Sequence, residues 1–188
     1  MLTPRINFKN FRVKKNSKVI KKDINYLLNL NNELISSLKK NYKFSYKKKL
    51  IQKYKKFSNV RIFGMGGSIL GTQAIYDFLK HKIKKKFYFI NNLKSFTKNQ
   101  NTHNFLNLIV SKSGNTTETI VNANLCIKKK QENIFITENK KSYLHILAQK
   151  LKSEIVHHNN YIGGRYSVLS EVGMLPAELM GLNYKKFR

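Results

Sequence analysis

The sequence predicts an α/β protein with a parallel sheet, and three observations support this fold class. From residue 60 onwards, short runs of β-branched or aromatic residues alternate with stretches of helical periodicity. The short runs are apolar throughout, which is typical of strands covered on both faces. Glycine-rich or hydroxyl-rich turns follow several of these runs. Strands joined by right-handed helical crossovers form a doubly wound, flavodoxin-like sheet with helices on both faces.

Five strands are expected, at residues 60–63, 87–90, 106–110, 133–137 and 154–156. The sequences "GTQAIYDFLK", "TTETIVNANLCIKK" and "SYLHILAQKL" lie between them and have helical periodicity, and a weaker connecting segment covers residues 93–103. Apolar stripes between residues 23 and 57 predict helices there as well. We therefore expect an N-terminal helical segment, residues 1–57, followed by an α/β domain, residues 58–188.

The composition is that of a globular protein. Of the 188 residues, 41% are hydrophobic and 12% aromatic. The single cysteine, Cys126, offers neither an intrachain disulfide nor a metal cluster, and the basic N-terminus lacks the apolar centre of a secretory signal. No apolar run approaches the roughly 18 residues that a membrane span requires. These features favour a cytoplasmic protein that does not bind membranes.

The formal net charge of +28 would suit a nucleic-acid-binding protein. However, the charge comes mainly from lysine, and it accompanies many Asn, Ile, Phe and Tyr residues. This combination indicates a bias in coding composition that spreads lysine over every solvated face. We therefore expect no nucleic-acid partner, although the charge would help to attract small anionic substrates.

The turn after the first expected strand reads "GMGGSILG". Gly66 and Gly67 allow a ligand to approach the main chain closely, and Ser68 lies near the start of a helix, where backbone amides favour an anion. The spacing is close to a dinucleotide-binding pattern, but Ile69 stands where that pattern has Gly or Ala. Taken alone, this loop is compatible with a tight turn, a dinucleotide site or a site for another anion.

The turn after the third expected strand reads "SKSGNTTET" and is rich in hydroxyl side chains. Ser113 or Asn115 is expected to cap the helix that follows, while the remaining hydroxyls and amides are free to bind a phosphate monoester. The alternative is a Ser/Thr-rich cap without a ligand. Because the chain lacks G-x-x-x-x-G-K-[ST], a small phosphorylated metabolite fits better than a nucleoside triphosphate.

The turn after the fifth expected strand reads "NYIGGRYS". Arg165 follows two glycines and precedes an apolar helix, so it is expected at a strand end beside the phosphate site, where it can stabilise developing negative charge. The alternative is an ordinary surface arginine. His157 and His158, at the end of the same strand, are interpreted as surface residues.

Together, the three loops resemble those of the glucose-6-phosphate isomerase (phosphoglucose isomerase) family, whose members contain sugar-isomerase (SIS) domains. "GMGGSILG" is similar to the family's first sugar-phosphate loop. "SKSGNTTET" is similar to its phosphate loop, often S-K-T-x-x-T-x-E-T, and "GGRYS" followed by Gly173 is similar to its signature. The resemblance covers residues 60–181 and implies that residues 58–188 form an SIS-type phosphosugar-binding domain.

The resemblance also implies roles for individual residues. The implied phosphate ligands are Ser111, Lys112, Ser113 and Thr116, and the implied pocket lining is Gly66, Gly67 and Ser68. Arg165 would stabilise an enediolate while glucose 6-phosphate and fructose 6-phosphate interconvert, a reaction of glycolysis and gluconeogenesis. No metal or organic cofactor is implied. The expected partner is the phosphosugar itself, and the full-length enzyme is expected to be a homodimer.

Three departures from the motifs of the family make the substrate assignment less specific. Ile69 stands where many members have Asp, Glu171 stands where the signature has a small residue or Pro, and residues 113–115 are closer to the S-x-S-G-x-T form of other sugar-isomerase domains. Members of the family continue into a second SIS domain that supplies a glutamate base, a histidine and a lysine, and no residue here matches these three. Neither Glu118 nor Glu171 is assigned as the base.

We therefore expect this chain to be the N-terminal, phosphosugar-binding part of an isomerase, without the second SIS domain and inactive alone. The alternatives are a stand-alone sugar-phosphate-binding SIS module, a related phosphosugar isomerase or aminotransferase domain, and a basic nucleic-acid-binding protein.

Overall fold

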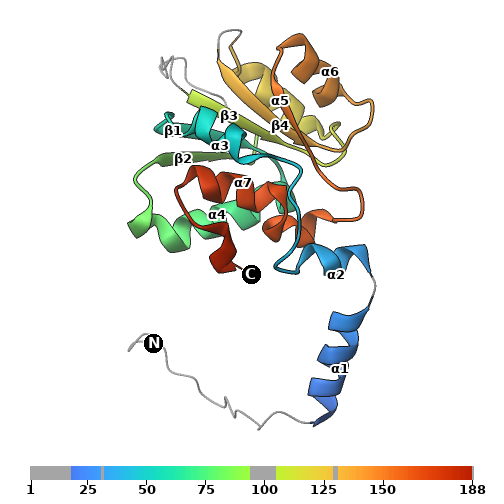
Figure 1. The fold of residues 1–188 in the computed structure, drawn as a ribbon. Helices are drawn as coiled ribbons and strands as arrows, with labels where there is room; N and C mark the ends of the chain where they lie inside the picture. The colour runs from blue at the N-terminus through green and yellow to red at the C-terminus, as the bar shows by residue number, and fades with distance from the viewer. Residues whose placement is uncertain (1–17, 31, 94–104, 129–130, 188) are drawn as a thin grey trace.

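The computed structural model describes residues 18–30, 32–93, 105–128 and 131–187 and contains a parallel sheet of five strands (Figure 1). The strands are β1 (Asn59–Phe63), β2 (Lys86–Ile90), β3 (Phe105–Val110), β4 (Glu132–Thr137) and β5 (Glu154–His157). Their order in the sheet is β2-β1-β3-β4-β5, and all four neighbouring pairs are parallel. The predicted fold class is confirmed, and each strand lies within about one residue of its predicted bounds.

Helices cover both faces of the sheet (Figure 1). One face packs against α3 (Lys48–Tyr54), α4 (Leu70–Leu79) and α7 (Glu171–Leu179). The other packs against α5 (Thr117–Cys126) and α6 (Tyr143–Lys150). Alternate strand residues supply the two cores: Ile62 and Leu108 face the first set of helices, and Phe63 and Ile109 face the second. Because both faces are buried, the strands are apolar almost throughout, as the sequence indicated.

Four short 3-10 helices complete the described structure: η1 (Gly66–Ser68), η2 (Lys80–Lys82), η3 (Gly164–Leu169) and η4 (Tyr184–Phe187). Two of them, η1 and η3, stand at the carboxyl ends of β1 and β5 and pack against each other. The predicted helix after "GGRYS" therefore begins later than expected. Residues 164–169 form η3, and α7 starts only at Glu171, where Ser170 accepts a hydrogen bond from the Val172 N–H.

Two further helices precede the sheet, α1 (Lys18–Asn29) and α2 (Glu33–Ser37). The first has no buried residue and extends away from the rest of the molecule (Figure 1). Its apolar stripe is therefore exposed, with Ile24, Leu27 and Leu28 each about half accessible to solvent. The predicted connecting segment at residues 93–103 lies almost entirely outside the described residues. None of the helices in the described part of the chain combines the length and apolar character of a membrane span.

Candidate functional site

The sheet order brings two of the three predicted loops together. The chain runs from β1 outward to β2 and then returns to the other side of β1 as β3, so the topological switch point lies between β1 and β3. Doubly wound sheets bind ligands in the crevice at this point, beyond the carboxyl ends of the strands. We call residues 64–68, which follow β1, the glycine loop, and residues 111–116, which follow β3, the hydroxyl loop. They lie on either side of this switch point.

The glycine loop also contacts the third loop. We call residues 158–165, which follow β5, the arginine loop. A Cβ atom on Gly67 would lie 2.2 Å from the carbonyl carbon and oxygen of Gly164, so only glycine permits this approach of the two backbones. The Ser167 hydroxyl lies between the loops and donates to the carbonyls of Gly67 (3.2 Å) and Gly164 (2.7 Å). All three predicted loops thus meet at one edge of the sheet.

The hydroxyl loop presents donors that the protein does not use. The hydroxyls of Ser111 and Thr116 lie 2.9 Å apart and share a hydrogen bond, and the Gly114 N–H donates to Ser111 Oγ (3.2 Å). Within the described residues, the backbone N–H groups of Lys112 and Ser113 donate to no protein group. The first N–H groups of α5, which follows immediately, have no intrahelical partner either. Such a cluster of free N–H groups at a helix start favours an anion.

The backbone of the hydroxyl loop is held by α6 rather than by α5. Asn115 Oδ1 accepts from the Tyr143 N–H (2.9 Å), and the Gly114 carbonyl accepts from the Leu144 N–H (3.0 Å). The expectation that Ser113 or Asn115 caps α5 is therefore wrong: Thr116 is the N-cap of α5 and makes no side-chain capping bond. Asn115 points to α6 because the chain turns there, at Gly114 with its φ of +68°.

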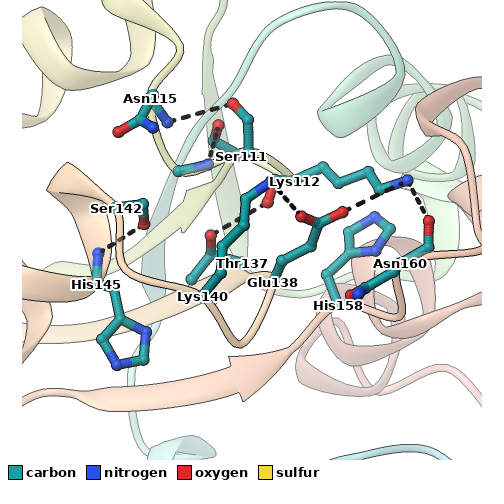
Figure 2. A network of polar contacts seen from close by, with 12 residues as sticks. Ser111, Lys112, Asn115, Thr137, Glu138, Lys140, Ser142, His145, His158 and Asn160 are labelled. Carbon is teal, nitrogen blue, oxygen red and sulfur yellow. Dashed lines mark hydrogen bonds and ion pairs between the residues drawn. The ribbon is translucent and has the colours of Figure 1, made fainter.

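The side chain of Lys112 leaves the hydroxyl loop. Its ammonium donates to the backbone carbonyl of Asn160 in the arginine loop and lies 3.6 Å from the Glu138 carboxylate (Figure 2). In Figure 2 it runs away from Ser111, and Glu138 lies between Lys112 and Lys140. In this structure Lys112 therefore offers a phosphate its backbone N–H, while its charge is engaged elsewhere.

Arg165 lies on η3, directly after Gly164, and is exposed. Its guanidinium makes no hydrogen bond or ion pair with the described residues. The contact between Gly164 and Gly67 therefore sets where the backbone of Arg165 stands, and its side chain is available to a ligand. Among all the residues that the structure describes, no group of three or more His, Cys, Asp or Glu side chains could hold a metal ion.

The interpretation of both histidines as surface residues is wrong for His158. This residue is only 1% exposed, and its backbone N–H donates to the Thr137 carbonyl (2.8 Å). Burial lowers the pKa of the His158 imidazole below 6.5. His157 is half-buried. The residues around this short strand gave no sign that His158 would be buried.

A second buried group, the carboxylate of Glu171, makes contacts that were not predicted from the sequence. The carboxylate of Glu171 is fully buried at the start of α7 and accepts from the Tyr42 hydroxyl (3.1 Å to each oxygen) and the Ser45 N–H (2.9 Å). Asn159 Nδ2 donates to the Tyr42 hydroxyl (2.6 Å). These bonds tie the N-terminal segment to the arginine loop and α7. The only sequence signal was the departure at Glu171 from the resembled signature.

Comparison with known proteins supports the assignment of the fold. A structure of a hypothetical protein from Thermus thermophilus superposes with a TM-score of 0.67 at 18% identity, over 89% of this chain and 45% of that one. The tagatose-6-phosphate ketose/aldose isomerase of Escherichia coli superposes with a TM-score of 0.53 at 15% identity, over 75% and 44% of the two chains. Likenesses at this level of identity show the fold: the chain shares its α/β fold with these two proteins.

Sequence comparison goes further. A family model described as phosphoglucose isomerase matches residues 12–188. The glucose-6-phosphate isomerase of Acholeplasma laidlawii is 34% identical over 157 residues, and that of Methanocaldococcus jannaschii is 37% identical over 152 residues. These matches cover 73% and 72% of this chain but only 37% of each relative. The chain belongs to the phosphoglucose isomerase family, which confirms the resemblance seen in the three loops.

Proposed function

We propose that this chain binds a hexose 6-phosphate in the crevice between the glycine and hydroxyl loops, as part of a glucose-6-phosphate isomerase. The observation that carries the proposal is the set of unpaired donors at the β1–β3 switch point. Family membership supports the reaction, the reversible conversion of glucose 6-phosphate to fructose 6-phosphate. With this activity, we expect a role in glycolysis and gluconeogenesis, in the cytoplasm. Residues 58–188 would form the phosphosugar-binding domain, with residues 1–57 as a helical lead-in.

The phosphate would be held by the hydroxyl loop. Ser111, Ser113 and Thr116 would contribute hydroxyls, and Lys112 its backbone N–H. A phosphate dianion has several acceptor oxygens, and the start of α5 adds a favourable dipole. Residues 66–68 would line the other wall of the crevice. Because Gly67 already touches Gly164, a sugar held there would lie beside the arginine loop.

Arg165 would stabilise the enediolate. Removing a proton from the carbon next to a carbonyl places negative charge on an oxygen, and a guanidinium beside that oxygen lowers the energy of the intermediate. Proton transfer also needs a base within hydrogen-bond reach. Glu171 is unsuited to this role because Tyr42 and Ser45 already occupy its carboxylate inside the protein. The roles we propose for this chain are substrate binding and charge stabilisation, without a metal or organic cofactor.

The test is a calorimetric titration of the chain with fructose 6-phosphate, inorganic phosphate and fructose. We expect fructose 6-phosphate to bind more tightly than phosphate, and fructose not to bind. Thr116→Ala should weaken both phosphate-containing ligands about tenfold, because it removes a hydrogen bond to a charged group. Arg165→Ala should weaken only fructose 6-phosphate. A folded chain that binds phosphate and fructose 6-phosphate equally would contradict the proposal.

A further inference from the structure

Lys112 connects three loops that come from three different strands. It belongs to the hydroxyl loop after β3, its ammonium contacts Glu138 after β4, and the same ammonium donates to the Asn160 carbonyl in the arginine loop after β5 (Figure 2). The backbone takes part as well, since the Glu138 N–H donates to the Lys112 carbonyl (3.1 Å). The long side chain of a flexible lysine is thus fixed at both ends.

Glu138 is placed to hold this lysine. Its side chain is only 9% exposed, so its charge needs partners inside the protein. One carboxylate oxygen faces Lys112, and the other lies 2.6 Å from the Lys140 ammonium. Burial would raise the pKa of the Glu138 carboxyl, but the hydrogen bond and charge of Lys140, together with Lys112, bring this pKa below its ordinary value. The group is therefore a carboxylate at neutral pH, and it balances the charge of Lys112.

The Asn160 carbonyl, to which Lys112 donates, belongs to the same loop as Arg165. Asn160 lies five residues before Arg165 in the chain, and the buried Ile162 between them donates through its N–H to the Asn159 carbonyl (3.1 Å). The arginine loop is thus anchored at Gly164 by the glycine loop and at Asn160 by Lys112. The second anchor is the one that links it to the hydroxyl loop.

We propose that Glu138 is a positioning residue of the phosphosugar site: its carboxylate holds the Lys112 ammonium on the Asn160 carbonyl and so fixes the spacing between the hydroxyl loop and the arginine loop. This inference rests on the proposed function. It assigns to Glu138 no contact with the substrate. It also explains why the lysine of a phosphate-binding loop directs its charge away from the crevice.

Selectivity between ligands should depend on this spacing. Inorganic phosphate needs only the hydroxyl loop, whereas a phosphosugar reaches across to the arginine loop and depends on the distance between them. Loss of the Glu138 charge releases Lys112 and removes a carboxylate from the neighbourhood of the bound anion. Phosphate should then bind as well as before or better, because a repulsive charge is gone. Fructose 6-phosphate should no longer bind much more tightly than phosphate.

The experiment measures the ratio of the two dissociation constants, phosphate over fructose 6-phosphate, for the chain and for Glu138→Gln. We expect this ratio to fall about fivefold in Glu138→Gln, the size of effect typical of residues that share one network. Glu132→Gln is the matched control: it removes the same charge from the other end of β4 and should leave the ratio unchanged. Thermal melting monitored by circular dichroism shows that each variant is folded.

A second variant distinguishes positioning from general disturbance. Lys112→Met keeps most of the length of the side chain without its charge and should lower the ratio as Glu138→Gln does. The double variant should lower it no further. An unchanged ratio in Glu138→Gln, or effects that add in the double variant, would overturn the role of Glu138 while leaving the proposed function intact. Equal binding of both ligands by the unsubstituted chain would overturn the proposed function and this inference together.

Discussion

Two polar networks lie against the same sheet, and they differ in whether their groups are satisfied. The first is a row of polar side chains across three neighbouring strands: Arg61 on β1, Asn107 on β3 and Asn133 on β4. These residues lie opposite one another in the register of the sheet. The second is the hydroxyl loop at the carboxyl ends of these strands. In the first network the side chains bond to one another, whereas the second leaves the backbone N–H groups of Lys112 and Ser113 without a partner among the described residues.

The first network is closed on itself. Arg61 Nε donates to Asn107 Oδ1 (2.9 Å), Arg61 Nη2 donates to Gln131 Oε1 (2.9 Å), and Asn107 Nδ2 donates to Asn133 Oδ1 (2.8 Å). The guanidinium also lies 4.5 Å from the centre of the Phe105 ring. A buried network of this kind rigidifies a core. Satisfied polar groups in this sheet thus serve the fold, whereas unsatisfied ones mark the site where we expect a ligand.

The largest effect on stability is expected in the closed network. Arg61→Leu leaves Asn107 Oδ1 without its donor and removes the charged donor of Gln131 Oε1, which keeps the Asn107 Nδ2 and Lys128 N–H donors. The free energy of unfolding should therefore fall by about 3 kcal/mol. Urea unfolding measures the loss, and Lys84→Leu, at an exposed position, is the control. The preference for fructose 6-phosphate should not change. A loss below about 1 kcal/mol would show that this network is not important for the fold.

Gly67 joins the two regions, so its replacement should affect both stability and binding. In Gly67→Ala the new methyl group would overlap the Gly164 backbone, which we expect to cost about 2 kcal/mol of unfolding free energy and to weaken fructose 6-phosphate binding. Gly163→Ala is a close control: its φ is −68°, and an added Cβ would come no nearer than 3.4 Å to another residue. Equal stability of the two variants would contradict the close approach of the loops.

A smaller effect is expected where α6 holds the hydroxyl loop. Asn115→Ala removes the acceptor of the Tyr143 N–H and should lower the unfolding free energy by about 1 kcal/mol, the usual cost of losing a cap. Hydrogen exchange should show faster opening of the first turn of α6, with that of α5 unchanged. Faster exchange in α5 instead would restore the capping role that the sequence suggested.

The smallest effect concerns pH. Because burial lowers the pKa of His158 below its ordinary value of 6.5, the unfolded chain binds a proton more readily than the folded one. Stability should therefore be full above pH 6.5 and fall as the pH drops through 6.5, by at most about 0.8 kcal/mol at pH 6. Urea unfolding of the chain and of His158→Phe between pH 5 and 8 measures this. If the unfolding free energy of His158→Phe depends on pH in the same way, another group causes this dependence.

The sequence was sufficient for the sheet and for the place of the loops. The central strands β1, β3 and β4 are buried on both faces, so their apolar runs were clear local signals. The rule that ligands bind beyond the carboxyl ends of parallel strands then selected the loops. The glycine, hydroxyl and arginine loops could accordingly be located from the sequence alone. Turn composition is a property of neighbouring residues, whereas the strand order β2-β1-β3-β4-β5 was established by the structure.

The direction of individual side chains could not be predicted in this way. Lys112 contacts Asn160, 48 residues later, and Glu171 accepts from Tyr42, 129 residues earlier. His158 is buried, and its backbone N–H donates to the carbonyl of Thr137, 21 residues earlier. These contacts depend on how distant segments pack, and periodicity carries no information about them. Asn115 shows the same limit over a shorter distance, since its partner Tyr143 belongs to α6 and not to α5, which directly follows Asn115.

The most direct test of the binding site is an NMR titration of the backbone amides with fructose 6-phosphate. We expect the largest shifts at Lys112, Ser113 and the first turn of α5, with smaller shifts in the glycine loop and none around Arg61. Inorganic phosphate should move the amides of the hydroxyl loop and of the first turn of α5, without those of the glycine loop. Shifts centred instead on the polar hollow lined by Glu33, Asn139, His157, Asn159, Asn160 and Tyr161 would contradict the proposed site.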